Sequence, residues 1–464
     1  MEAIDRKYVY FLGIGGIGMS ALARYFKQQG KSVAGYDRTS TDLTKTLQSE
    51  GMLIHYEDSV SKIPADFLRN PAETLLVYTP AVPAEHSELK YFVKKGFEVF
   101  KRSKVLGLIF NRHKGVAVAG THGKTTVSTL LSHLMIHGNL NAIAFLGGIS
   151  KNYHSNLILG PGNEYVVAEA DEFDRSFLQL NPQLAIITSC DADHLDIYGS
   201  HEEVIKSFDL FAKQVKQNGI LIIKKGLPLS PAAGKNVKVY SYSAMESADF
   251  HAMNHHYSGG KSRFDLKTPK GIEQGLELIL PGKANIENSV AALAAGILLG
   301  IPMDSLRRGL AGFTGVVRRF DIQYAGTSLT YIDDYAHHPE ELKAIINAAR
   351  EMFPGKKLAG IFQPHLFTRT RDFADGFAES LDQLDELIML DIYPARELPI
   401  KGVNSEMIMA RMKNKNHLGC TKKNLMKQLE STEFEVLLTL GAGDIDTFVG
   451  PIKEFVIKKD KAKK

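Results

Sequence analysis

Seven consecutive residues have the composition of a phosphate-binding loop: Gly120-Thr121-His122-Gly123-Lys124-Thr125-Thr126. Glycines allow backbone N–H groups to converge on phosphate oxygens, and the start of a helix after the loop adds a partial positive charge. Lys124 can reach the terminal phosphates of a nucleoside triphosphate, and the Thr125 hydroxyl can bind Mg²⁺. Val118 stands where the full pattern has glycine, so the loop is a shortened variant. These residues predict a site for ATP with Mg²⁺, and an ordinary glycine turn is the alternative.

Two polar clusters, residues 169–174 and 191–196, each follow an apolar run of the same segment. Ligands of open α/β sheets bind beyond the carboxyl ends of the strands, so both clusters can face the phosphates. Mg²⁺ prefers oxygen ligands, which Glu169 supplies, whereas a neutral His194 is a less usual ligand. Solvated acidic loops are the alternative.

A second glycine turn lies near the N-terminus, where Gly13, Gly15 and Gly18 follow an apolar run and Asp37 ends the next one. This spacing matches the fingerprint of a dinucleotide-binding site. By itself it predicts a phosphate site but does not choose the nucleotide. An NAD-dependent oxidoreductase therefore remains a rival at this point.

The last part of the chain carries further polar motifs. The pair Arg318-Arg319 is either a surface pair or a clamp on transferring phosphate charge. Two further motifs follow expected strands, residues 333–339 and residues 362–365 with Arg369. Neither H-E-x-x-H nor G-x-S-x-G is present, so covalent catalysis by a side chain is not favoured.

Strands and helices that alternate along the chain must position these residues, and they predict three α/β segments with parallel sheets. We expect helices at 124–137, 340–350 and 374–381, and a linker at 102–115. Expected strands are residues 8–12, 32–36, 74–78, 97–100, 116–119, 165–168, 184–188, 219–223, 329–332, 357–362, 386–390 and 434–440.

Composition narrows the class of protein. The 464 residues suffice for two to four domains, and the formal charge of +4 is small for this length. The lysine-rich end, residues 458–464, is expected to be a solvated end and not a nucleic-acid arm. Two cysteines argue against a disulfide framework. No targeting segment or membrane-spanning run is apparent, so we expect a cytoplasmic enzyme without a membrane partner.

Taken together, the motifs resemble the Mur ligase family of peptidoglycan synthesis over nearly the whole chain. They are Gly13-Ile14-Gly15-Gly16-Ile17-Gly18-Met19-Ser20, the loop at 120–126, Glu169-Ala170-Asp171-Glu172, Asp193-His194-Leu195-Asp196, Asn285-Ile286-Glu287-Asn288, Arg318-Arg319-Phe320, Asp333-Asp334-Tyr335-Ala336-His337-His338-Pro339 and Phe362-Gln363-Pro364-His365.

The resemblance implies an ATP-dependent ligase that joins L-alanine to the carboxylate of UDP-N-acetylmuramate, in three domains. A Rossmann-like domain (1–110) would bind the UDP-sugar, a P-loop domain (111–318) ATP, and a Rossmann-like domain (319–464) the amino acid. The implied catalytic residues are Lys124, His194, Arg319 and His337. Mg²⁺ would be held by Thr125, Glu169 and His194. The implied ATP-binding residues are those of the loop at 120–126, with Asn285 and Asn288. The implied substrate-binding residues are Gly13, Gly15, Gly16, Ile17, Gly18, Asp37, Arg102, Tyr335, His337, His365 and Arg369.

Two positions depart from the family's pattern. Leu366 stands where some members have a second arginine, so alanine binding would depend more on Arg369. Several sister ligases use a carbamylated lysine near the position of Asp209, but the nearest lysine here is Lys206, so no carbamylated lysine is assigned. Three alternatives remain: a sister ligase that joins a ready-made tripeptide to the same nucleotide sugar, the NAD-dependent oxidoreductase, and a non-catalytic nucleotide switch.

Overall fold

The computed structural model describes residues 2–193, 195–230, 234–395 and 397–462. The chain divides into two compact units, each described by itself below. Unit 1 comprises Met1–His251, Leu266–Ile272 and Asn288–Leu310, and unit 2 comprises Ala252–Asp265, Glu273–Glu287 and Ala311–Lys464.

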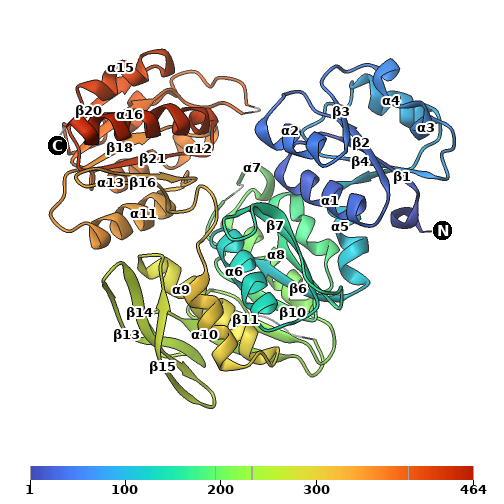
Figure 1. The fold of residues 1–464 in the computed structure, drawn as a ribbon, viewed down its shortest axis with the longest axis horizontal. Helices are drawn as coiled ribbons and strands as arrows, with labels where there is room; N and C mark the ends of the chain where they lie inside the picture. Colours follow the sequence, from blue (N-terminus) through green and yellow to red (C-terminus); the bar gives the residue numbers. More distant parts are fainter. Residues whose placement is uncertain (1, 194, 231–233, 396, 463–464) are drawn as a thin grey trace. The chain divides into compact units, whose positions relative to one another are not determined.

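Unit 1 begins with a five-stranded parallel sheet (Figure 1). Its strands are β1 (Tyr8–Leu12), β2 (Ser32–Tyr36), β3 (Leu53–His55), β4 (Thr74–Tyr78) and β5 (Val99–Lys101). They lie in the order β3-β2-β1-β4-β5. The helices that follow them are α1 (Ile17–Gln28), α2 (Asp42–Ser49), α3 (Ala65–Leu68), α4 (Ser87–Lys94) and α5 (Arg102–Asn111).

Both faces of this sheet are covered, because successive strand side chains point to opposite faces. Val9 and Phe11 pack into a core with residues of α1, α2 and α5. Tyr10 and Leu12 pack on the other face against residues of α3 and α4, including Phe67. The segment 102–115 is therefore not a linker, as the sequence suggested: its apolar residues are buried on α5, and Arg102 starts that helix.

The second sheet has ten strands in the described part of the chain. They are β6 (Lys114–Ala119), β7 (Ala142–Ser150), β8 (Ser155–Leu159), β9 (Tyr165–Ala170), β10 (Leu184–Ile187), β11 (Ile220–Lys224), β12 (Lys238–Ser243), β13 (Phe250–Ser258), β14 (Lys261–Thr268) and β15 (Gly271–Leu278). Their order is β15-β14-β13-β12-β11-β10-β6-β9-β7-β8. The pairs from β12 to β7 are parallel, whereas the edge strand β8 is antiparallel to β7.

The helices of this segment are α6 (Lys124–His137), α7 (Leu195–Tyr198), α8 (His201–Lys213), α9 (Lys283–Leu298) and α10 (Met303–Gly312). Helix α6 packs against β6, β7 and β9. Residues of α8 share one core with Ala117, Ala119 and residues of the first sheet, so the first sheet and strands β6 to β12 of the second belong to one compact unit.

The third sheet lies in unit 2. Its strands are β16 (Asp321–Ala325), β17 (Thr330–Asp334), β18 (Leu358–Phe362), β19 (Glu386–Leu390), β20 (His417–Cys420) and β21 (Val436–Leu440). The order is β16-β17-β21-β18-β19-β20, and only the β16–β17 pair among the described strands is antiparallel. The helices are α11 (Pro339–Met352), α12 (Phe367–Asp372), α13 (Ala374–Leu381), α14 (Glu406–Met409), α15 (Leu425–Glu430) and α16 (Val449–Ala462).

Short 3-10 segments complete the described elements: η1 (Ala3–Asp5), η2 (Val60–Lys62), η3 (Phe173–Gln179), η4 (Lys422–Asn424) and η5 (Asp444–Phe448). Every expected strand and helix is present, with bounds that differ by no more than two residues. Among the described residues, no helix combines the length and the apolar composition that crossing a membrane requires.

The lysine-rich end is more structured than the sequence suggested, because it continues α16 to Ala462 and buries Asp460. The Asp460 carboxylate accepts hydrogen bonds from the backbone N–H groups of Thr327, Ser328 and Leu329 and from the Tyr324 hydroxyl, at 2.9–3.0 Å. This one side chain therefore fixes the turn between β16 and β17.

We expect Asp460→Asn to lower the thermal unfolding midpoint by a few degrees at pH 7, because an amide cannot accept all four bonds. Burial would raise the pKa of Asp460, but its hydrogen bonds outweigh burial and lower it. A carboxylate with a lowered pKa contributes stability above its unfolded pKa of about 4 and loses it as the pH falls through the folded value. In thermal melts between pH 7 and 3, the difference in unfolding midpoint between wild type and Asp460→Asn should shrink as the pH falls. Lys458→Ala is the control. A difference that does not depend on pH would contradict this assignment.

Candidate active site

The predicted phosphate loop, residues 120–126, connects β6 to α6. Two of its glycines have backbone conformations that side chains disfavour, with φ of 141° at Gly120 and 84° at Gly123. A methyl group at Gly120 would also lie 2.1 Å from the Thr188 hydroxyl oxygen. Gly123 is the N-cap of α6, and Lys124 is its first residue. The loop thus has the strand–turn–helix placement on which the phosphate prediction depends.

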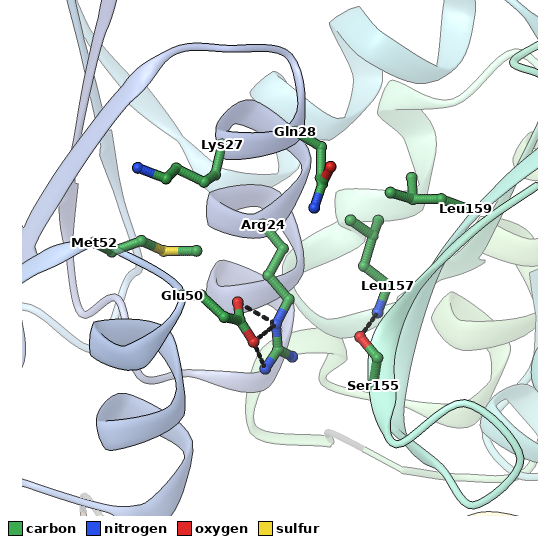
Figure 2. A pocket seen from close by; sticks show the side chains of 8 residues that line it. All are labelled: Arg24, Lys27, Gln28, Glu50, Met52, Ser155, Leu157 and Leu159. Atoms are coloured by element: carbon green, nitrogen blue, oxygen red, sulfur yellow. Dashed lines mark hydrogen bonds and ion pairs between the residues drawn. The ribbon is translucent and has the colours of Figure 1, made fainter.

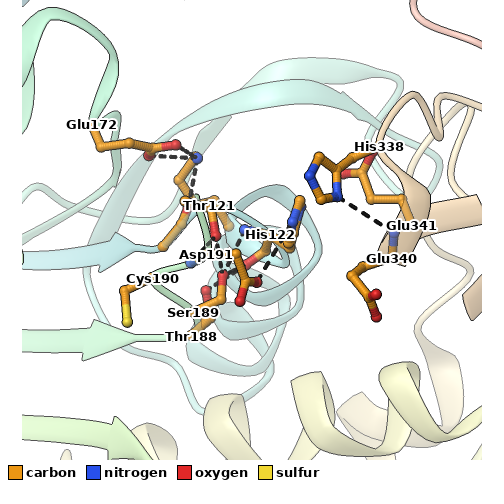
Figure 3. A network of polar contacts seen from close by, with 12 residues as sticks. Thr121, His122, Glu172, Thr188, Ser189, Cys190, Asp191, His338, Glu340 and Glu341 are labelled. Carbon is orange, nitrogen blue, oxygen red and sulfur yellow. Dashed lines mark hydrogen bonds and ion pairs between the residues drawn. The ribbon is translucent and has the colours of Figure 1, made fainter. Parts of the chain in front are cut away.

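Residues that directly follow β10 form hydrogen bonds with the loop (Figure 3). The Ser189 hydroxyl accepts from the backbone N–H of His122 at 2.7 Å and lies 2.9 Å from the Thr121 hydroxyl. The Thr188 hydroxyl donates to the His122 carbonyl at 2.5 Å. We did not single out Thr188 and Ser189 from the sequence. Their position directly after a parallel strand is the signal that could have found them.

Lys124 is the most strongly constrained charge in the loop. Its ammonium donates to the Gly120 carbonyl at 2.5 Å and to both Glu172 carboxylate oxygens at 2.7 and 3.0 Å. Burial would lower the pKa of Lys124, but Glu172 and the nearby acidic residues outweigh burial, and the pKa is raised. Lys124 therefore remains a cation at neutral pH. Burial raises the pKa of Glu172, an effect that the ammonium opposes.

Oxygen donors for a cation lie at the start of α6. One Glu169 oxygen is 3.2 Å from the Thr125 hydroxyl, and the other accepts from Ser128 at 3.2 Å and from the Gly147 N–H at 2.6 Å. A hydroxyl and a carboxylate fit Mg²⁺, which binds few protein oxygens and completes its shell with water and phosphate. The described residues contain no group of three or more His, Cys, Asp and Glu side chains arranged for a metal. His194, the other predicted ligand, lies outside the described residues.

The N-terminal glycine turn, residues 13–18, occupies the corresponding place after β1. Gly15 N–H donates to Asp37 at 2.8 Å, so this carboxylate braces the turn. Gly18 lies against Arg102: a methyl group there would be 2.8 Å from the guanidinium. Arg102 also pairs with Asp171 at 3.3 Å, close to the acidic group around Glu172. Gly13, Gly15, Gly16, Ile17, Gly18, Asp37 and Arg102 are thus brought together.

The two predicted ATP-binding residues outside the loop, Asn285 and Asn288, lie on α9. A methyl group at Gly123 would be 2.9 Å from the Asn288 side-chain oxygen, so Asn288 belongs to the surroundings of the phosphate loop. Asn285 belongs to unit 2, where its side chain donates to the Pro281 carbonyl at 2.8 Å.

In unit 2 the arginine pair has two different environments. Arg318 donates to Asp333 at 3.0 Å and to the Gly441 carbonyl at 2.6 Å, so it is tied into the fold. Arg319 lies 3.7 Å from Glu341, and both guanidinium groups lie 5.2 Å from the Tyr335 ring centre. Both arginine side chains are partly buried, and each has an acidic partner.

Three of the remaining predicted residues of unit 2, Tyr335, His337 and His365, form a row of rings. The Tyr335 and His337 rings are 5.2 Å apart, and the His337 and His365 rings 5.8 Å. Tyr393, which we did not predict, stacks on His365 at 5.7 Å. Arg369 is buried on α12, which begins just after His365.

One of the two adjacent histidines, His338, has a structural role at the start of α11. The His338 ring accepts from the Glu340 N–H at 3.4 Å and so caps α11 (Figure 3). His337 pairs with Glu341 at 3.2 Å. His338 thus caps the helix and packs on the Phe373 ring, whereas the His337 ring lies beside the Tyr335 and His365 rings.

Three models of one family match successive parts of the chain. They are described as "Mur ligase family, catalytic domain" at residues 8–114, "Mur ligase middle domain" at 118–296 and "Mur ligase, glutamate ligase domain" at 318–443. The chain therefore belongs to the Mur ligase family. The resemblance seen in the motifs is confirmed, and so is the three-domain α/β fold.

Individual relatives are similar over the full length. A UDP-N-acetylmuramate–L-alanine ligase of Parabacteroides distasonis is 51% identical over 451 residues, 97% of each chain. One of Phocaeicola vulgatus is 49% identical over 99% of this chain and all of the relative. The crystal structure of the UDP-N-acetylmuramate–alanine ligase of Thermotoga maritima superposes with a TM-score of 0.81 at 26% identity, covering 98% of this chain and 100% of that one.

We expect Glu172→Gln to lower the pKa of Lys124, because burial then meets less opposing negative charge. The measurement is a pH titration by NMR of protein carrying ¹³C-methylated lysines, with the Lys124 signal assigned by its loss in Lys124→Arg. Glu164→Gln, which removes the partner of the exposed Lys114, should leave that signal unchanged. Identical titration in the wild type and Glu172→Gln would show that Glu172 does not set the charge state of Lys124.

Proposed function

We propose that this chain is an ATP-dependent ligase that joins L-alanine to the carboxylate of UDP-N-acetylmuramate, with ADP and phosphate as products, in peptidoglycan synthesis. The observation that carries the proposal is the largely buried Lys124 ammonium, paired with Glu172 and placed beside the Thr125–Glu169 oxygen pair. Together they offer a cation and a metal site to a triphosphate at a helix start. The substrates are inferred from relatives that carry this activity in their names and are about 50% identical to this chain over its full length.

The chemistry follows from the poor reactivity of a carboxylate. One carboxylate oxygen attacks the γ-phosphorus, the bond to the β-phosphate oxygen breaks, and ADP leaves. The alanine amine then attacks the carbonyl carbon of the acyl phosphate, phosphate departs, and the amine loses a proton to give the amide. Lys124 and Arg319 offset the negative charge of phosphoryl transfer.

Magnesium fits the oxygen donors of Thr125 and Glu169. When bound, it supplies Lewis-acid stabilisation of the phosphate oxygens. We assign His194 as a further ligand and catalytic residue from the family resemblance. The phosphate loop, with Asn285 and Asn288, is the proposed ATP site.

The substrates are assigned to the other residue groups. The glycine turn with Asp37 and Arg102 is proposed for the UDP diphosphate, in a UDP-sugar domain at 1–110 that precedes an ATP domain at 111–318. Tyr335, His337, His365 and Arg369, in an amino-acid domain at 319–464, are proposed for L-alanine, with Arg369 on its carboxylate. Because ATP and nucleotide sugars are intracellular substrates, we propose a cytoplasmic location.

The decisive assay is phosphate release from ATP with UDP-N-acetylmuramate present and amino acids supplied one at a time. The proposal predicts release with L-alanine. Release only with a ready-made tripeptide would instead identify the sister ligase, and reduction of NAD with no phosphate release would identify an oxidoreductase.

Lys124→Ala should lower kcat for phosphate release by at least about 100-fold, since it removes a charge that stabilises phosphoryl transfer. Lys114→Ala is the matched control, because that lysine lies exposed at the start of β6. A Lys124→Ala enzyme with more than about a tenth of wild-type kcat would remove Lys124 from this role.

Arg369→Ala should raise KM for L-alanine by about 10- to 100-fold, the value of a charge-assisted hydrogen bond, and should change KM for ATP little. Arg371→Ala, on the same helix and exposed in part, is the control. Initial rates over an alanine series measure the effect. An unchanged alanine requirement would mean that another group binds the carboxylate.

A further inference from the structure

A single buried amide joins the central sheet to the helix that follows the N-terminal glycine turn. Asn156 lies on the edge strand β8 and is fully buried. Its Nδ2 donates to the Ile17 carbonyl at 2.5 Å and to the Ser20 hydroxyl at 2.8 Å. Its Oδ1 accepts from Arg24 at 2.5 Å. All three contacts are with α1, and they use both ends of the amide.

Arg24 extends the network to the end of α2. Its guanidinium donates to both oxygens of Glu50 at 2.8–3.0 Å, as Figure 2 shows beside the small pocket lined by Ser155 and Leu157. Arg24 is only 7% exposed, so its charge depends on Glu50 and Asn156 for partners. The network therefore specifies one arrangement of α1 against β8.

The hairpin that carries Asn156 is itself held at the phosphate loop. Strand β7 pairs with β9 in parallel, and its Gly147 N–H donates to Glu169 at 2.6 Å. Strand β8 then pairs with β7 from Ser150↔Ser155 onward. Asn156 thus connects the central sheet to the first turn of α1, so a shift of the hairpin would move that turn.

The first turn of α1 has no side-chain cap. Its N-cap is Gly16, which has no side chain to cap the helix. The backbone N–H groups at a helix start act on phosphate only when they are held in place. Asn156 holds this turn from the opposite side, through the Ile17 carbonyl and Ser20.

We propose that Asn156 is a positioning residue for the diphosphate of the nucleotide substrate, acting through the first turn of α1. The inference rests on the proposed function of the glycine turn as the UDP site. Asn156 itself does not touch substrate. Its loss should therefore weaken diphosphate binding and leave the ATP site intact.

The test uses the full chain with Asn156→Leu and Asn156→Asp. The aspartate can still accept from Arg24 but cannot donate to the Ile17 carbonyl, so it isolates the contact with the first turn of α1 from the contact with Arg24. Ser155→Ala is the matched control, since Ser155 is on the same strand and its hydroxyl accepts only from the Leu157 N–H among the contacts found. Calorimetry gives the Kd of UDP, of UDP-N-acetylmuramate and of ATP with Mg²⁺, and steady-state rates give KM and kcat.

Both variants should raise the Kd of UDP and of UDP-N-acetylmuramate by about tenfold, or about 1.4 kcal/mol. The Kd of ATP should stay within about twofold of wild type, and kcat at saturation should change less than KM for the nucleotide sugar. A merely structural role would weaken both ligands together, because the same hairpin holds Glu169.

Two results would overturn the inference: unchanged UDP affinity in a folded variant, or equal losses for UDP and ATP. If Asn156→Leu does not fold, Asn156→Asp provides the same comparison. A wild-type protein that binds neither UDP nor the nucleotide sugar would overturn the proposed function together with this inference, whereas normal wild-type binding with unaffected variants would overturn the inference alone.

Discussion

A buried ammonium group requires negative partners, and the surroundings of Lys124 are arranged around that requirement. The Gly120 carbonyl and the Glu172 carboxylate supply them at 2.5–3.0 Å. An uncompensated buried charge would cost several kcal/mol, so this pairing fixes the end of β9 against the start of α6. A triphosphate carries the same kind of charge that Glu172 now offers. The site thus holds its cation in place and in its charged form before any phosphate binds.

Sheet topology explains why the other groups gather around this lysine. Strands β6, β9 and β10 are adjacent and parallel, so the segments that follow them meet at one edge. The glycine turn after β1 repeats the same strand–turn–helix geometry in the first sheet. The Arg102–Asp171 pair and the Asn156 network are among the contacts that join the sheets of unit 1. Both meet at the first turn of α1, where Gly18 and Ile17 lie.

Much of this was predictable from the sequence. Helix α6 was predicted with its correct bounds, because glycines flank a continuous apolar pattern. The hairpin β7–β8 and strands β12 to β15 were missed. Glycines interrupt β7 and β15, and β12 and β13 are partly exposed and rich in polar residues, so their local signals are weak. Helix α5 was taken for a linker because basic residues precede its short apolar stretch. Thr188 and Ser189 support the loop only through the pairing of β10 with β6, a tertiary contact that local sequence does not encode.

The central claim is that main-chain amides and Lys124 hold the phosphates of ATP in the loop at 120–126. A crystal structure with a non-hydrolysable ATP analogue and Mg²⁺ tests it most directly. We predict terminal phosphate oxygens within hydrogen-bond distance of Lys124 and a cation on the Thr125 and Glu169 oxygens. Density for the nucleotide elsewhere, with this loop vacant, would contradict the account.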